Sequence, residues 1–252
     1  MKLQNKSVLI TGGNSGIGLG IATKLREEGA KGVIVGRNPD TLASASHSLG
    51  DDFVALQCDV TKLDELERMF RRAEEAVGKL DVLVVNAGGA VGAGSIQPFA
   101  EVDEHSFAAM TDLNFKSVFF TVQKALPHLN DGASIILVAS IAVHKGFPGM
   151  SVYGACKGAV RSLARTLSTE LMPRAIRVNV LSPGTIDTPV FSRLGISEDE
   201  ATAMKEEFAG LIPMKRTGSP GEMGGVAAFL ASSDSSFVVG EEIVADGGVV
   251  NL

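Results

Sequence analysis

The stretch SVLITGGNSGIG, residues 7–18, decides the fold. A short apolar run passes directly into Gly12, Gly16 and Gly18, and the residues that follow, LGIATKLREEG, suit a helix. Glycines permit a tight turn and a close backbone approach, and a helix N-terminus offers unpaired N–H groups to a pyrophosphate. A strand before the turn and a helix after it form the context that a dinucleotide site requires. We therefore expect such a site here rather than a merely tight turn.

Apolar runs rich in Val and Ile recur along the whole chain. They lack the alternation of half-solvated strands, which is typical of strands buried on both faces of a parallel sheet. The runs are residues 7–11, 32–36, 53–58, 81–86, 134–140, 176–181 and 242–246. Segments of helical length separate them, and right-handed βαβ crossovers then give a doubly wound fold. We predict an α/β protein with a Rossmann-type parallel sheet of about seven strands.

Two of the intervening segments stand out. Residues 61–79 carry apolar side chains at steps of three and four with charges on the other side, which predicts a helix that covers the sheet. The apolar positions are Leu63, Leu66, Phe70, Ala73 and Val77. Residues 183–213 exceed an ordinary strand-to-helix link, and we expect about 185–213 to form a lid. No repeat or linker divides the chain, so residues 1–252 are expected to form a single domain.

The composition excludes several classes of function. With 23 Lys and Arg against 29 Asp and Glu, the net charge of −6 gives no general attraction to nucleic acid or to an anionic membrane. The two cysteines, Cys58 and Cys156, cannot form a disulfide framework, and no Cys/His spacing indicates a metal site. The N-terminus has no apolar region followed by a cleavage site, and no apolar run approaches the length that spans a bilayer. We expect a cytoplasmic protein.

The residues after the second strand predict which dinucleotide binds. An NAD site usually offers a carboxylate to the ribose 2′-OH at this position, whereas an arginine accommodates the 2′-phosphate of NADP. The chain reads VIVGRNPD, so Arg37 and Asn38 stand where that carboxylate would be. Asp40 follows Pro39 and is expected to cap the next helix. We predict NADP(H) as the cofactor; the alternative is that Arg37 is an ordinary surface residue.

Tyr153, the only tyrosine of the chain, lies four residues before Lys157 in a helical stretch, so the two share a face. A phenol titrates near about 10, and an adjacent ammonium group together with the charge of an oxidised nicotinamide would make it acidic enough for proton transfer. Ser140 ends the fifth strand at the sheet edge where open α/β sheets bind ligands, and Asn114 lies in a helix after the fourth. Alone, the Tyr-x-x-x-Lys spacing would indicate a pair on the surface of a helix. Together with Ser140 and Asn114 it predicts a proton relay.

Together these residues resemble the short-chain dehydrogenases/reductases over essentially the whole chain. The markers are TGGNSGIG, CDV (58–60), NAG (86–88), Asn114, Ser140, YGACK (153–157) and SPG (182–184). The resemblance implies that Tyr153 is the catalytic acid/base and that Ser140 polarises the substrate oxygen. It implies that Lys157 lowers the pKa of the phenol and holds the nicotinamide ribose, and that Asn114 holds a water linking Lys157 to solvent.

The resemblance also implies a set of cofactor contacts. Asp59 would lie on the adenine side, Thr188 would donate a hydrogen bond to the nicotinamide amide, and Ile186 would contact that amide through its backbone. The full expected set is Gly12, Asn14, Ser15, Gly16, Ile17, Gly18, Arg37, Asn38, Asp59, Val60, Asn86, Ala87, Gly88, Tyr153, Lys157, Pro183, Gly184, Ile186 and Thr188. Family members usually form tetramers through the helices after strands four and five and through the last strand, so a homotetramer is expected.

The substrate is expected to be an apolar ketone or secondary alcohol, because the segments predicted to wall its pocket are mostly apolar. The apolar positions in these segments (88–94, 141–150 and 189–195) are Val91, Val143, Phe147, Met150, Val190 and Phe191. Within the family the chain is similar to bacterial NADPH-dependent alcohol dehydrogenases that accept secondary alcohols and ketones. His144 is close to Ser140 in sequence, but a single histidine with no partner in sequence is interpreted as a loop residue.

Two other functions stay open. A 3-oxoacyl-carrier-protein reductase would share the catalytic residues and the cofactor, but an acidic carrier needs a basic docking surface and only Arg174 stands out. A non-catalytic NADP(H)-sensing protein on the same fold would be expected to lose one of the four relay residues, and all four are present.

Overall fold

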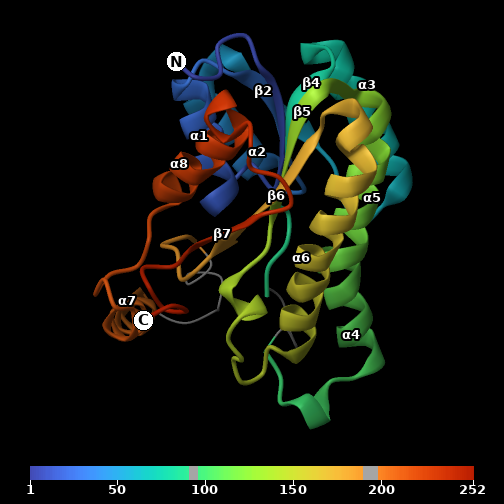
Figure 1. The fold of residues 1–252 in the computed structure, drawn as a ribbon. Helices are drawn as coiled ribbons and strands as arrows, with labels where there is room; N and C mark the ends of the chain where they lie inside the picture. The colour runs from blue at the N-terminus through green and yellow to red at the C-terminus, as the bar shows by residue number, and fades with distance from the viewer. Residues whose placement is uncertain (91–95, 190–197) are drawn as a thin grey trace.

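The computed structural model describes residues 1–90, 96–189 and 198–252. A seven-stranded parallel sheet in the order β3-β2-β1-β4-β5-β6-β7 lies at its centre (Figure 1). The strands are β1 (Ser7–Thr11), β2 (Lys31–Gly36), β3 (Phe53–Gln57), β4 (Leu80–Val85), β5 (Leu129–Val138), β6 (Arg177–Pro183) and β7 (Glu242–Ala245). All seven predicted runs form strands, and the predicted α/β fold with a doubly wound sheet is confirmed. The order reverses between β1 and β4, where such sheets bind ligands.

Helices cover both faces of the sheet (Figure 1). One face packs against α1 (Gly16–Glu27), α2 (Pro39–Leu49) and α8 (Pro220–Ala231). The other packs against α3 (Leu63–Val77), α5 (Ser117–Ala125) and α6 (Ser151–Leu171). α4 (Glu104–Thr111) leads into α5 through a π turn (Asp112–Lys116), and α7 (Glu198–Leu211) lies near the C-terminus. Short 3-10 turns are Gly50–Asp52, Phe99–Glu101, Leu126–His128, Ile141–Val143, Met172–Arg174 and Ser233–Ser235.

Two apolar cores explain why the strands read as continuous apolar runs. Successive side chains of a strand point to opposite faces. In β1, Leu9 therefore joins the core under α3, α5 and α6, while Val8 and Ile10 join the core under α1, α2 and α8. Both faces of the sheet exclude water, so Val8, Leu9 and Ile10 are all apolar and do not alternate with polar residues.

The predicted helix over residues 61–79 is α3, and its apolar face includes one residue that was not predicted, Met69. Met69 is buried together with the predicted Leu66, Phe70 and Ala73, whereas Leu63 and Val77 are only partly buried. The step from Leu66 to Met69 is also three residues, so this position belongs to the same face.

The expectation that Asp40 caps α2 is wrong. Asn38 occupies the N-cap, and its Oδ1 accepts from the backbone N–H of Asp40 at 2.9 Å and of Thr41 at 3.0 Å. Pro39 takes the first helical position, which its fixed φ favours, so the cap falls one residue before it.

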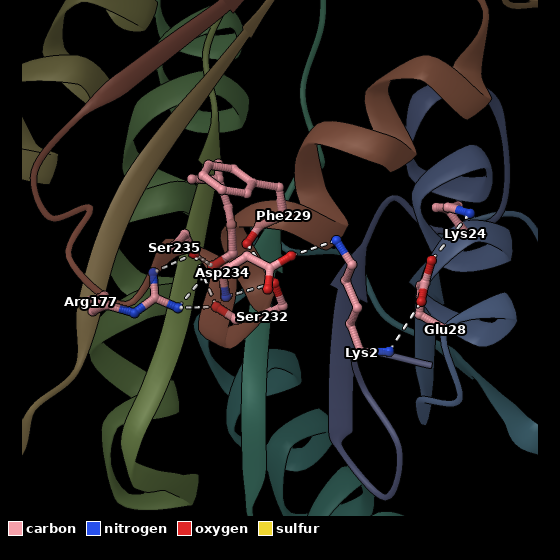
Figure 2. A network of polar contacts seen from close by, with 9 residues as sticks. Lys2, Lys24, Glu28, Arg177, Phe229, Ser232, Asp234 and Ser235 are labelled. Carbon is pink, nitrogen blue, oxygen red and sulfur yellow. Dashed lines mark hydrogen bonds and ion pairs between the residues drawn. The ribbon is translucent and has the colours of Figure 1, made fainter.

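A polar network at the amino-terminal edge of the sheet joins the start of the chain to the turn after α8 (Figure 2). Lys2 pairs with Asp234 at 2.5 Å. The guanidinium group of Arg177, at the start of β6, donates to Ser235 Oγ at 3.0 Å and to the carbonyls of Leu230 and Ser232 at 2.9 and 3.3 Å. A cation at the carboxyl end of α8 satisfies carbonyls that the helix leaves unpaired. This edge is therefore built for stability.

We expect Arg177→Met to lower the free energy of unfolding by about 2 kcal/mol, because it removes charged hydrogen bonds and leaves partly buried carbonyls unpaired. Urea unfolding measures the change. Arg71→Met, on the exposed face of α3, is the control and should lie close to wild type. Equal unfolding free energies for R177M and wild type would contradict the assigned role.

Candidate active site at the carboxyl edge of the sheet

The glycine turn lies where β1 ends and α1 begins. Gly12 and Gly16 have φ angles of 64° and 52°, a region that disfavours side chains. A Cβ on Gly18 would lie 2.1 Å from the carbonyl oxygen of Gly12, so the helix and the turn touch backbone to backbone. The N–H groups of the first turn of α1 have no partner within the helix, as at any helix N-terminus, and they follow the glycine turn directly, which suits an anion. These features fit the pyrophosphate of a dinucleotide.

Asn86 holds the glycine turn in place. Its side-chain amide donates to the carbonyl oxygens of Thr11 at 3.0 Å and Gly12 at 3.2 Å. Thr11 Oγ1 accepts in return from the N–H groups of Asn86 and Ala87 at 3.0 and 3.1 Å. Thr11 was not among the predicted residues, although a polar residue that ends an apolar strand just before a glycine turn is a usable signal. These bonds tie β1 to β4 at the point where the strand order reverses.

The adenosine end of the expected cofactor site lies beyond β2 and β3. Arg37 is exposed at the end of β2, and a Cβ on Gly36 would lie 2.4 Å from Asn14 Oδ1. A cavity of about 450 Å³ adjoins these residues. It is lined by Arg37, Leu56, Gln57, Asp59, Glu65, Arg68, Met69 and Arg72. Arg37 and Asp59, predicted separately as cofactor contacts, thus line one cavity, while Val60 is buried beside it.

Three of the four predicted relay residues meet where β5 ends and α6 begins. The Ser140 side chain lies close enough to the Tyr153 phenol to favour the phenolate, and its Oγ accepts from the N–H of Ala142 at 3.2 Å. Lys157 Nζ donates to the carbonyl oxygen of Val138 at 2.9 Å and lies 5.7 Å from the centroid of the Tyr153 ring. Lys157 is only 3% exposed, whereas Ser140 and Tyr153 are partly buried, so the ammonium group lies beneath two side chains that still reach the surface.

Asn114, the fourth residue, is fully buried in the π turn between α4 and α5. Its Nδ2 donates to the carbonyl oxygens of Met110 and Gly89, both at 3.1 Å, and its Oδ1 accepts from the N–H of Gly89 at 2.8 Å. A Cβ on Gly88 would lie 2.9 Å from Asn114 Oδ1 and 3.2 Å from Lys157 Nζ. The amide and the ammonium group therefore approach the same point, and the structure brings all four relay residues into one cluster.

Burial dominates the proton affinities of this cluster. Burial raises the pKa of the Tyr153 phenol, and the hydrogen bond with Ser140 offsets only part of the rise. Burial also lowers the pKa of Lys157 to about 8. The lowering of the phenol pKa by Lys157 stays a prediction for the protein with its cofactor bound, since burial sets the direction in the protein by itself.

The segment after β6 returns over the glycine turn. Pro183 ends the strand, and the N–H of Gly184 donates to the carbonyl oxygen of Ala245 in β7 at 3.0 Å. A Cβ on Gly16 would lie 3.2 Å from Thr188 Cγ2, so Thr188 faces the start of α1.

The lid predicted over residues 185–213 is described in part. Ile186 is buried, and the carboxylate of Asp187 pairs with Lys205 of α7 at 2.5 Å. Residues 190–197 lie outside the described part of the chain, and with them the predicted wall residues Val190 and Phe191.

The remaining predicted walls are partly in place. Val143 packs against the apolar core beside α6, while Phe147 and Met150 are partly exposed. Val91 lies outside the described residues. Gln97, which the sequence analysis did not single out, donates through its N–H to the carbonyl of Gly149 at 3.0 Å, and its buried Oε1 has no hydrogen-bond partner in the described part of the chain.

Comparisons with known proteins identify the family. A family model described as enoyl-(acyl carrier protein) reductase matches residues 12–250. An oxidoreductase from Sarocladium schorii, asL5, is 40% identical over 100% of this chain and 98% of the relative. The chain belongs to the short-chain dehydrogenase/reductase family. Human dehydrogenase/reductase SDR family member 4 is 34% identical over 98% of this chain and 88% of its own length.

Solved structures of short-chain dehydrogenases/reductases share the fold. One from Brucella melitensis, described as a glucose/ribitol dehydrogenase, aligns over 98% of both chains with a TM-score of 0.89 and 35% identity. As a short-chain dehydrogenase/reductase, the protein is an oxidoreductase of a family that typically uses a nicotinamide cofactor. Over residues 1–90, 96–189 and 198–252, no helix is long and apolar enough to cross a membrane. The same residues contain no group of three His, Cys, Asp or Glu side chains placed to hold a metal ion.

The phenol of Tyr153 can be titrated selectively, because the chain has no other tyrosine and no tryptophan. We expect the ultraviolet absorbance of its phenolate to appear only above the ordinary value of about 10, since burial raises its pKa. The stability that this group contributes is then present below about pH 10 and is lost as the pH rises through the folded-state pKa. Tyr153→Phe should abolish the signal, and a midpoint at or below the ordinary value would contradict the structure.

Proposed function

We propose that this short-chain dehydrogenase/reductase transfers a hydride between NADP(H) and an apolar ketone or secondary alcohol, with Tyr153 as the acid/base. The observation that carries the proposal is the cluster of Ser140, Tyr153 and the buried Lys157 at the same edge of the sheet as the glycine turn that starts α1. The nicotinamide would supply or accept the hydride. The chain's own residues would handle the proton.

The proton would move at the Tyr153 hydroxyl. In reduction this group donates its proton to the substrate oxygen, which the Ser140 hydroxyl orients and polarises; in oxidation the same groups act in reverse. The ammonium form of Lys157 would favour the phenolate that remains. Because the pKa of Lys157 is lowered to about 8, the group can exchange a proton near neutral pH. The Asn114 amide is occupied by Gly89 and Met110, so we assign the expected water contact to backbone carbonyls of the π turn.

NADP(H) rather than NAD(H) is supported by the charges at the end of β2. Arg37, Arg68 and Arg72 line the cavity beside the expected adenosine position, and Arg37 can contact a phosphate bidentately. The carboxylates of that cavity are engaged within the chain: Asp59 accepts from Thr61, and Glu65 accepts from the N–H of Asp59 at 2.8 Å. Arg68 is paired with Asp64 at 2.8 Å, so a 2′-phosphate would chiefly meet the guanidinium groups of Arg37 and Arg72.

Assembly and location follow the same proposal. Exposed apolar side chains lie on α4 and α5, at Phe107 and Phe119, and just before β7, at Phe237 and Val239. These are the elements through which the family resemblance implies a homotetramer. Cys58 and Cys156 are both free and buried, which suits the reducing cytoplasm.

The carrier-protein alternative is less well supported. Arg174, its candidate docking residue, is bound to Asp131 at 2.8 Å and to the carbonyls of Leu126 and Leu129 at the amino end of β5. Ser140 follows the opposite end of that strand. A carrier that brings its cargo to Ser140 would not meet this charge. The cofactor-sensing alternative is disfavoured because all four relay residues form one cluster.

Tyr153→Phe tests the catalytic proposal. We expect NADPH-dependent reduction of a ketone panel to fall about a thousandfold, because the proton donor is lost, while NADPH binding by fluorescence is retained. Ser162→Ala, on the exposed side of α6, is the control and should keep wild-type rates. Binding of NADPH without turnover in the wild type would favour the sensing protein, and full activity in Y153F would sink the mechanism.

Arg37→Asp tests the cofactor assignment. We expect the ratio of kcat/KM for NADPH over NADH to fall at least about tenfold, because the variant repels the 2′-phosphate. Binding of adenosine 2′,5′-bisphosphate relative to AMP should weaken in parallel, which does not depend on turnover. Arg71→Asp makes the same change of charge outside the cavity and should leave the ratio intact. An unchanged preference for NADPH over NADH in R37D would contradict the assignment and support the alternative that Arg37 is an ordinary surface residue.

A further inference from the structure

A buried carboxylate outside the relay, that of Glu242 in β7, binds three partners at once. The side chain is 6% exposed. Its Oε1 accepts from Ser182 Oγ at 2.5 Å and lies 3.0 Å from His144 Nε2, and its Oε2 accepts from Arg161 Nε at 2.8 Å. His144, interpreted from the sequence as a loop residue without a partner, thus has one far away in the chain.

The three partners belong to the three segments that carry the candidate site. His144 follows Ser140 by one 3-10 turn. Arg161 lies one helical turn beyond Lys157 on α6, and Ser182 directly precedes the proposed cofactor stretch after β6. A single carboxylate therefore joins three of the segments whose spacing the proposed reaction must hold fixed: the one after β5, helix α6 and the one after β6.

The charge of this carboxylate is maintained by its contacts. Burial raises the pKa of Glu242, but hydrogen bonds from Ser182, His144 and Arg161 outweigh it, so the pKa lies below its ordinary value. Arg161 also donates to the carbonyl of Gly240 at 3.1 Å, which fixes the direction of its guanidinium group. Buried ion pairs contribute little net stability, and their best use is to specify one arrangement of the groups around them.

We propose that Glu242 is a positioning residue that fixes the Ser140 segment, helix α6 and the cofactor stretch after β6 relative to one another. It acts through its three partners and touches no reacting atom. The inference rests on the proposed function, since it takes those segments to hold the reacting groups.

Glu242→Gln, with Glu241→Gln as its matched control, tests the proposal by kinetics. Glu241 is the adjacent, exposed carboxylate. In E242Q we expect kcat to fall about tenfold or more with little change in the KM for NADPH, because small displacements between reacting groups are costly. E242D keeps the charge on a shorter side chain and should recover part of kcat. E241Q should match wild type.

A second measurement needs no turnover. Titration of the single tyrosine reports how Tyr153 is packed, and loosening of α6 from the Ser140 segment should admit water and move its midpoint down toward the ordinary value. We expect this shift in both E242Q and E242D and not in E241Q. A shift in E242D, which keeps the charge, separates positioning from a simple loss of negative charge.

The outcomes separate the two proposals. Wild-type protein that reduces no ketone with NADPH would remove the proposed function, while the titration would still decide whether Glu242 positions Tyr153. Active wild type together with wild-type kcat and titration midpoint in E242Q would overturn the positioning role. A lower unfolding temperature in E242Q with unchanged kcat per NADPH-binding site would overturn it as well, since that is the result of a purely structural contact.

Discussion

Burial of the Lys157 ammonium group is the constraint on which the site depends. A charge removed from water is costly unless polar atoms meet it, and here the carbonyl of Val138 accepts its hydrogen bond while the Tyr153 ring lies beside it. Gly88 must lack a side chain, because a Cβ would lie 3.2 Å from the Nζ atom. The end of β5, the start of α6 and the turn after β4 are thus fixed around the Lys157 ammonium group. Burial also sets the direction in which the pKa values of Tyr153 and Lys157 are shifted.

The two edges of the sheet differ in how they use polar groups. At the amino edge, Arg177 donates to a serine hydroxyl and to backbone carbonyls, so donors and acceptors satisfy one another within the chain. At the carboxyl edge, Asn86 and Thr11 engage backbone atoms only, and they hold the glycine turn open at the start of α1. Polar groups at the amino edge form their hydrogen bonds within the chain. Polar groups at the carboxyl edge shape a site where N–H groups of α1 can bind a ligand.

Local features were readable from the sequence, and non-local ones were not. The buried strands could be predicted as apolar runs because both faces of the sheet are covered. β5 is the exception: it starts at Leu129 rather than at the predicted 134, because polar residues near its start precede a shift in its pairing with β4. The relay residues were found through their motif. The direction of the Tyr153 pKa depends on burial that no spacing encodes, and the partner of His144 stands on the last strand of the sheet, where only the fold brings it near.

The π turn at Asn114 ties chain length to geometry. Each residue of an α-helix is rotated by about 100° around the helix axis from the one before it. The π turn contains one residue more than an α-helical turn, so it determines which side chains of α4 and which of α5 lie on the same face. Insertion or deletion of a single residue between these helices would realign one of them and carry the Asn114 amide away from Gly89. The segment from α4 to α5 is therefore expected to tolerate substitutions far better than changes in length. As the sequence of this enzyme diverges, the number of residues between the two helices should stay the same.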